Sequence, residues 1–216
     1  MISNHVSYLD FVFVGLLGRR SQRFVRFLCR YDAWGNLFAG PAMTAMQHIP
    51  VDRAAPAGAY VQARAALRGG EIVGIFPEAG VSRAFTVRAL MRGGVALARE
   101  THAPLYLAAV WGPQRIATPG LPISLRRGRP LSIRLAGPVP VRPDLGLDAA
   151  TADVAHRLQQ LLEKVQRSHP DQPLPGKPAP WHPAHLGGTA PTAVDADAVA
   201  DVPRSAVHPP LPSAMF

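Results

Sequence analysis

Hydrophobic and polar positions along this chain follow two periods, one near two residues and one near 3.6 residues. Short apolar runs that end at proline, glycine or charged residues predict buried strands, and longer amphipathic or alanine-rich runs predict helices. The predicted strands cover residues 24–28 (strand or helix end), 48–51, 71–76, 105–111 and 131–136. The predicted helices cover residues 8–17, 57–68, 89–100 and 147–165, with a weakly helical apolar stretch at 34–46. Strands that alternate with helices are typical of an α/β domain.

Composition divides the chain near Arg167. Residues 168–216 hold eleven of the 23 prolines and a net charge of −2, whereas the first 167 residues carry 21 basic and 10 acidic groups, or +11. A proline-rich, alanine-rich segment of this kind buries too little apolar surface to offset its ordering entropy. We therefore expect a folded domain at 1–167 and a tail at 168–216 that is mostly extended or disordered.

The basic balance suggests an anionic partner, either nucleic acid, an anionic membrane surface or a phosphorylated substrate, but a solvated basic surface explains the charge at least as well. The sequence holds no aromatic-basic module of a recognised type, so we expect no nucleic-acid partner. Cys29 is the only cysteine, which excludes an internal disulfide and a multi-cysteine metal site. The apolar run at 11–17 is too short to cross a bilayer. These features together favour an intracellular protein that lies on a membrane.

An imidazole and a carboxylate stand five positions apart at the start of the chain, in His5 and Asp10. One interpretation is structural, because Ser7 and Asp10 have the spacing of a capping box at a helix start. The other is catalytic. If His5 lies on the loop before the helix, Asp10 in the first turn could hold one ring nitrogen protonated and leave the other to accept a proton.

Two further segments carry chemistry that suits a phosphate group. Arg53 follows a short predicted strand, and a guanidinium can bind two phosphate oxygens at once. Glu78 lies at the carboxyl end of a buried strand, the usual ligand side of an α/β sheet, and Gly80 would let the backbone approach an anion closely. Taken singly, Arg53 could be a surface residue and the Pro77–Glu78 pair a simple turn.

In order and spacing, four blocks resemble the glycerolipid acyltransferase family, which includes 1-acylglycerol-3-phosphate acyltransferases. The family's first motif, Asn-His, four residues and Asp, is matched by Asn4, His5 and Asp10. Its second, a strand that ends in arginine, is similar to residues 49–53, and its third, Phe-Pro-Glu-Gly, is approached by residues 76–79. Its fourth, an apolar strand with proline near its start, looks like residues 103–107. The resemblance covers roughly residues 2–167.

This resemblance implies an α/β acyltransferase fold with a mixed central sheet flanked by helices, located at the cytoplasmic face of the cell membrane. It implies an acyl-CoA or acyl carrier protein donor and a lysophospholipid acceptor, most simply 1-acylglycerol-3-phosphate, with no cofactor and no metal. By the same resemblance, His5 activates the acceptor hydroxyl and Asp10 orients His5. The substrate-binding residues would be Asn4, Arg53, Glu78, Gly80 and Arg83.

The chain departs from the family pattern in the third motif. Ala79 stands where glycine is usual, and Gly80 and Val81 stand where Thr-Arg is common, so Arg83 could replace the missing arginine. This form, together with residues 111–115 and the tail stretch 181–191, looks like an actinobacterial branch, and that tail stretch could dock as an extended segment.

The start of the chain raises one further expectation. Only three residues precede Asn4, which leaves no room for a preceding strand, so we expect the N-terminal elements of the fold to be missing. An alternative function follows from this expectation, namely a catalytically impaired lipid-binding remnant of such an enzyme.

Overall fold

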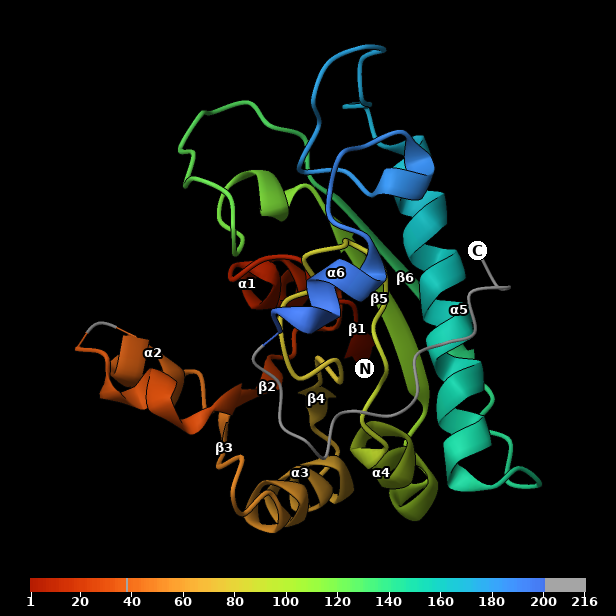
Figure 1. The fold of residues 1–216 in the computed structure, drawn as a ribbon. Coiled ribbons are helices and arrows are strands. Elements are labelled where there is room, and N and C mark those ends of the chain that lie inside the picture. Colours follow the sequence, from red (N-terminus) through yellow and green to blue (C-terminus); the bar gives the residue numbers. More distant parts are fainter. Residues whose placement is uncertain (38, 201–216) are drawn as a thin grey trace.

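The structure is a computed structural model that describes residues 1–37 and 39–200. Its centre is built from strands that run side by side through the molecule (Figure 1). They are β1 (Ile2–Ser3), β2 (Val25–Arg30), β3 (Ile49–Val51), β4 (Ile72–Gly74), β5 (Leu105–Trp111) and β6 (Ser132–Val139). Five of these six lie within one to three residues of the predicted bounds. The exception is β1, which occupies the short segment where we expected no room for a strand.

The strands form two ladders in the orders β3-β2-β4 and β1-β5-β6, and only β6 runs antiparallel to its neighbour. A parallel bridge between Ile2 and Ile75 joins the two ladders. It includes hydrogen bonds from the amide of Ser3 to the carbonyl of Ile75 and from the amide of Ile75 to the carbonyl of Met1. The mixed α/β sheet expected from the resemblance is therefore confirmed.

Strand β5 is covered on both faces, as its continuous apolar run predicts. Ala108 and Val110 face a cluster that includes Val14 of the first helix, α1 (Asp10–Gly15). Leu107 and Trp111 face the opposite cluster, which includes the apolar stripe of α5 (Leu147–Ser168). Packing on both faces of β5 therefore holds the residues that flank the strand in place.

Most helices agree with the sequence pattern, and the differences have local causes. Helix α3 (Ala57–Arg68) has the predicted bounds, and α2 (Ala39–Ala45) lies in the stretch predicted to be weakly helical. The first helix is shorter than predicted, because α1 is followed by a 3₁₀ segment, η1 (Leu16–Ser21). Helix α4 (Gly93–Thr101) begins four residues late. The amides of Val87 and Arg88 are instead bound by the side chains of Gln159 and Glu78, which holds that segment as a loop.

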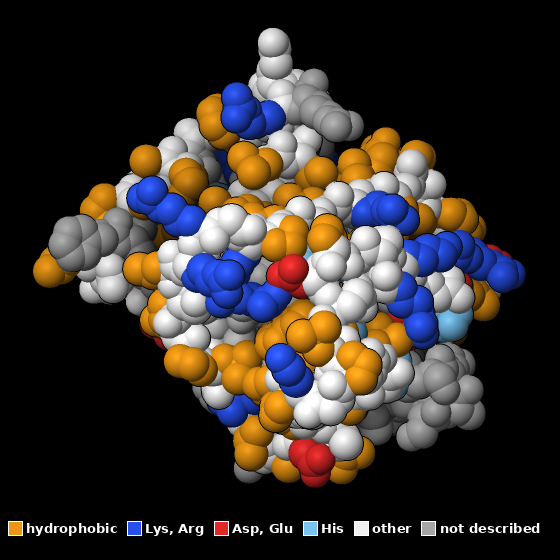
Figure 2. All heavy atoms as spheres, turned by 90° about the horizontal axis from the view of Figure 1, so that it is seen from above, with side chains coloured by type: hydrophobic (Ala, Val, Ile, Leu, Met, Phe, Trp, Pro, Cys, Tyr) orange, Lys and Arg blue, Asp and Glu red, His pale blue; other side chains and the backbone are white. Residues whose placement is uncertain are grey.

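The loop after β5 and the start of the tail lie at one end of the molecule, in the upper part of Figure 1. Seen from that end, the surface carries many more lysine and arginine side chains than acidic ones, with hydrophobic side chains between them (Figure 2). Within the described residues, no helix combines the length and the hydropathy needed to cross a bilayer.

The tail packs against the domain over the part that the structure describes. His182 is fully buried, with its ring 5.6 Å from that of Trp111, and Trp181 packs against the same core cluster. The stretch 181–191 therefore docks, although composition predicted mostly extended or disordered chain. Short helical segments, η4 (Ala184–Leu186) and α6 (Ala193–Ala198), interrupt the extended chain, and residues 201–216 lie outside the described residues.

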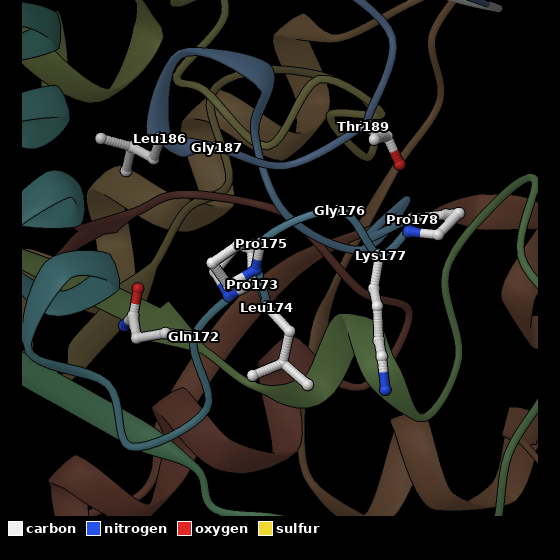
Figure 3. Close-up of a pocket in the computed structure, with 10 residues that line it drawn as sticks. All are labelled: Gln172, Pro173, Leu174, Pro175, Gly176, Lys177, Pro178, Leu186, Gly187 and Thr189. Carbon is white, nitrogen blue, oxygen red and sulfur yellow. The ribbon is translucent and has the colours of Figure 1, made fainter.

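Part of the tail also lines a hollow of about 560 Å³ (Figure 3). Its lining consists of residues 172–178, 186, 187 and 189, and none of them is a predicted site residue.

Candidate active site

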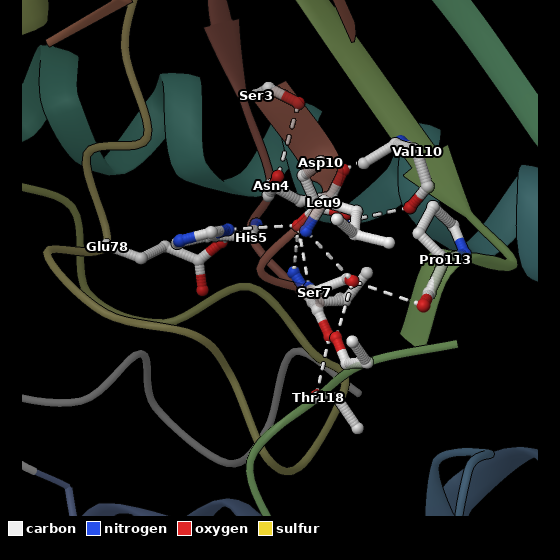
Figure 4. Close-up of polar contacts among 12 residues, drawn as sticks. Ser3, Asn4, His5, Ser7, Leu9, Asp10, Glu78, Val110, Pro113 and Thr118 are labelled. Atoms are coloured by element: carbon white, nitrogen blue, oxygen red, sulfur yellow. Dashed lines mark hydrogen bonds and ion pairs between the residues drawn. The ribbon is translucent and has the colours of Figure 1, made fainter. Parts of the chain in front are cut away.

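His5 and Asp10 are in contact, as the catalytic interpretation of their spacing requires (Figure 4). His5 lies on the loop between β1 and α1, and its Nδ1 is 2.9 Å from Oδ2 of Asp10, the first residue of α1. The side chain of His5 is 21% exposed and that of Asp10 is fully buried. Within the described residues, Nε2 of His5 has no hydrogen-bond partner. A carboxylate on Nδ1 favours the tautomer that leaves Nε2 free to accept a proton.

The structural interpretation of Asp10 also holds in part. Its Oδ2 accepts hydrogen bonds from the amides of Val6 at 2.6 Å and Ser7 at 2.8 Å, so the carboxylate returns to the backbone before the helix. The reciprocal bond of a capping box is missing, because Ser7 Oγ accepts from the amide of Leu9, the N-cap, and the amide of Asp10 donates to the carbonyl of Ser7. Burial raises the pKa of Asp10, and the bonds from His5 and the two amides oppose that shift. Oδ2 of Asp10 therefore binds both the backbone of the loop before α1 and the imidazole of His5.

Asn4 lies in the interior, where its side chain binds the backbone of β5. Its amide nitrogen donates to the carbonyl of Val110 at 3.1 Å, and its Oδ1 accepts from the amide of Val110 at 2.8 Å. The full burial of Asn4 and its double bond to β5 suit a residue that fixes the adjacent His5 relative to the sheet. Its assignment to substrate binding stays a prediction.

Glu78 is also buried, and its carboxylate binds backbone rather than solvent. Oε1 accepts from the amide of His5 at 2.8 Å, and Oε2 accepts from the amide of Arg88 at 2.9 Å. Burial raises the pKa of Glu78 to about 7 against the opposing effect of these bonds. These contacts tie the third motif to the loop of His5, and the assignment of Glu78 to substrate binding stays a prediction.

The loop after β4 wraps around His5. The amide of Ser82 donates to the carbonyl of His5 at 2.7 Å, and the ring of Phe76 stacks on the imidazole with centroids 4.5 Å apart. Ala79, at the position where the resembling family usually has glycine, has a φ of 56°, in the left-handed region. The loop therefore forms one wall of the site and adopts a backbone conformation that suits glycine.

Arg53 and Arg83 approach this region from two sides. Nη2 of Arg53 donates to the carbonyl of Ala79 at 2.9 Å, which brings the second motif to the third. Gly80 follows directly and is partly buried. A Cβ added at Gly120 would lie 3.7 Å from Nη1 of Arg83, so Arg83 is next to the loop after β5. Within the described residues, Arg83 makes no hydrogen bond or ion pair. Their assignment to substrate binding stays a prediction.

Sequence reasoning missed the contacts that fasten the site to the loop after β5. Ser7 Oγ donates to the carbonyls of Pro113 and Ala117, and Thr118 Oγ1 donates to the carbonyl of Val6. The partners are more than 100 positions apart in the chain, so no local pattern could reveal them. Among the described residues, no group of three or more His, Cys, Asp or Glu side chains could hold a metal ion.

Comparisons with known proteins gave a family match and a similar solved structure. The profile of the Acyltransferase family matches residues 1–111, which include the segments of His5, Arg53 and Glu78. Among solved structures, the chain is similar to the 1-acyl-sn-glycerophosphate (LPA) acyltransferase, PlsC, from Thermotoga maritima, with a TM-score of 0.57 and 15% sequence identity. That match covers 79% of this chain and 67% of the other. A search of curated proteins found no match.

Proposed function

This chain belongs to the Acyltransferase family, and from that premise we propose that it moves a fatty acyl group from acyl-CoA or acyl carrier protein to the hydroxyl of a lysophospholipid. The acceptor that we favour is 1-acylglycerol-3-phosphate. The observation that carries the proposal is the contact between Nδ1 of the partly exposed His5 and Oδ2 of the buried Asp10.

The proposed reaction uses His5 as a general base and then as a general acid. Nε2 takes the proton from the acceptor hydroxyl as its oxygen attacks the thioester carbonyl carbon, while Asp10 stabilises the imidazolium that forms. The C–S bond then breaks, and the leaving thiolate takes the proton from Nε2. No covalent acyl-enzyme is required, and Cys29 is a poor nucleophile, because burial raises the pKa of its thiol to about 12.

In this proposal the acceptor's phosphate binds between Arg53 and the loop 78–80. Arg53 already donates to the carbonyl of Ala79, so its guanidinium is held at the edge of that loop. Arg83 supplies a second cation from the far end of the same loop. Asn4 and Glu78 support the site from behind through their bonds to Val110 and to the amides of His5 and Arg88.

We also propose that the protein works on an anionic membrane surface. Three exposed apolar side chains are spaced four residues apart, Tyr8 in the turn before α1, Val12 in α1 and Leu16 at the start of η1. Phe24 is exposed as well. The exposed Arg23 flanks this apolar face. Apolar side chains with neighbouring arginines suit the interface of an anionic bilayer, where each basic residue contributes about 1 kcal/mol.

The test is acyl transfer by the purified chain, measured as thiol release from palmitoyl-CoA with 1-acylglycerol-3-phosphate and with other lysophospholipids. An acyl carrier protein thioester serves as the second donor. His5→Ala should lower kcat by about 10²–10⁴-fold. His156→Ala, a surface change on α5 that removes a hydrogen bond with Gln160, should leave turnover unchanged. Turnover by His5→Ala at the wild-type rate would rule out the mechanism. Lipid binding without turnover by the wild type would favour a binding protein instead.

A further inference from the structure

A second cluster of cations lies outside the residues used above. A hollow of about 170 Å³ separates the loop after β5 from the start of the tail, and four arginines line it together with one acid: Arg115, Arg126, Arg127, Arg129 and Asp171. None of these residues belongs to the four motifs of the sequence or to the proposed reaction.

The fold holds two of the four guanidinium groups in place. Arg115 belongs to η3 (Pro113–Arg115), directly after β5, where it forms an ion pair with Asp171 and lies 4.1 Å over the ring of Trp181. Arg129 donates to Ser124 Oγ at 2.9 Å. Salt bridging and stacking restrict the rotamers of Arg115, so this part of the hollow is preorganised by the docked tail.

The other two arginines of the hollow, Arg126 and Arg127, have guanidinium N–H groups that are available to a ligand. Arg126 and Arg127 are exposed on the turn before Gly128, whose φ of 78° reverses the chain. Within the described residues, neither makes a hydrogen bond or an ion pair. Their side chains can therefore turn toward a ligand without breaking an existing contact.

The charges of this hollow do not balance. Four guanidinium groups against one carboxylate leave three positive charges around a small volume. Burial lowers the pKa of Arg115, Asp171 opposes that shift, and the charges of Arg129 and Arg126 add to it. The guanidinium groups that line this hollow repel one another, and an anion bound between them would be attracted to each of them.

We propose that this hollow binds a phosphate group. Guanidinium groups pair with phosphate oxygens two at a time, which suits a cluster of this composition. The volume lies below the roughly 300–1,000 Å³ of pockets that hold drug-sized molecules, so the hollow fits a phosphate group rather than a whole nucleotide. Two phosphate carriers can reach this end of the molecule, a soluble phosphate ester and the headgroup of an anionic lipid.

Hydrogen bonds connect the segment that lines the hollow to the candidate active site. Ser7 Oγ and the amide of Tyr8 bond to the carbonyl of Ala117, two residues after Arg115. A phosphate bound in the hollow would thus be held by the segment that also fixes the loop of His5. The inference itself concerns binding and does not depend on the proposed transfer reaction.

Binding is the direct test, measured by calorimetry at low salt with inorganic phosphate and with adenosine 3′,5′-diphosphate. Flotation with vesicles of phosphatidylcholine, with and without phosphatidic acid, tests the lipid source. The variant is Arg126→Ala/Arg127→Ala. Its control, Arg68→Ala/Arg92→Ala, removes the same charge from the ends of α3 and α4 near which these two exposed residues lie. Thermal unfolding of both variants checks that the fold is intact.

We expect the Arg126→Ala/Arg127→Ala variant to bind phosphate at least about tenfold more weakly, because two charge-assisted donors are lost, and the control to change less than twofold. Tighter binding of the diphosphate than of phosphate would identify a soluble ester as the ligand. A loss confined to phosphatidic acid vesicles would identify the lipid headgroup. If the variant and its control behave alike in all arms, or if no arm shows binding, the proposal is overturned.

Discussion

Glu78 and His5 are joined by a hydrogen bond of 2.8 Å from the amide of His5 to Oε1 of Glu78, although 73 positions separate them in the chain. The other oxygen of Glu78 accepts from the amide of Arg88. One buried carboxylate therefore ties together the loop of His5, the third motif and the segment before α4. Any change at Glu78 therefore acts on the backbone that orients His5.

The raised pKa of Glu78 predicts a pH dependence of stability. Because the folded state holds the proton up to about pH 7 and the unfolded chain only to about 4.5, the folded state binds more protons in this window. The contribution, on the order of 3 kcal/mol, is fully present below pH 4.5 and is lost as the pH rises to about 7. Glu78→Gln cannot titrate, so the difference in unfolding free energy between wild type and variant should shrink across this window. Urea unfolding from pH 4.5 to 7.5 measures it, and a constant difference would contradict the shifted pKa.

His182 should produce the opposite slope. Burial lowers the pKa of His182 to about 4, so between pH 4 and 6.5 the unfolded state binds more protons and stability falls as the pH falls. His182→Phe keeps an aromatic ring between Trp111 and Trp181 and removes the titration. The variant should gain stability relative to wild type as the solution is acidified, by on the order of 3 kcal/mol at pH 4. Parallel urea series show this, and equal slopes for both proteins would exclude a buried neutral His182.

Asp10→Asn separates catalysis from stability. The asparagine can still accept from the amides of Val6 and Ser7, but it cannot stabilise a protonated His5. We expect kcat to fall by about 10²–10⁴-fold. Stability at neutral pH should not fall, because burial raises the pKa of Asp10 and the variant removes a buried charge. Steady-state kinetics and urea unfolding measure the two quantities, with Asp153→Asn on α5 as the control. A variant that loses its fold together with its activity would show that Asp10 is mainly structural.

Arg53→Ala tests the proposed phosphate contact of the acceptor. Loss of a charge-assisted hydrogen bond worth about 1.5–3 kcal/mol should raise KM for 1-acylglycerol-3-phosphate by roughly 10–100-fold. The KM for a monoacylglycerol, which lacks the phosphate, should hardly change. Kinetics with the two acceptors give the comparison, and an equal rise in both KM values would mean that Arg53 acts only through its bond to the Ala79 carbonyl.

The elements that the sequence predicted are those whose signal is local. The apolar run of β5 and the 3.6-residue stripe of α5 each identify their own element, because burial on one or two faces determines the pattern. The contact of His5 with Asp10 was predictable for the same reason, since it spans five positions.

The features that the sequence did not reveal depend on partners far along the chain. The side chains of Gln159 and Glu78 bind the amides of Val87 and Arg88 and hold the segment before α4 as a loop, a long-range effect that the local pattern at 89–100 does not contain. Asn4 matches a motif, but its burial follows from pairing with Val110, 106 positions away. Docking of the stretch 181–191 was one of the sequence-based expectations, but the contact of His182 with Trp111 that holds it could not be predicted from proline content.

Ala79→Gly should stabilise the protein, although glycine substitutions usually destabilise. The left-handed φ of 56° costs an alanine about 1–2 kcal/mol, whereas the added freedom of glycine in the unfolded chain costs about 0.5–1 kcal/mol. A net gain of up to about 1 kcal/mol follows, measured by urea unfolding. Ala65→Gly, at an exposed position within α3, is the matched control and should lose about 0.5–1 kcal/mol. If both variants lose the same amount of stability, the backbone at position 79 is not left-handed in solution, and glycine at the third motif has a reason other than conformation.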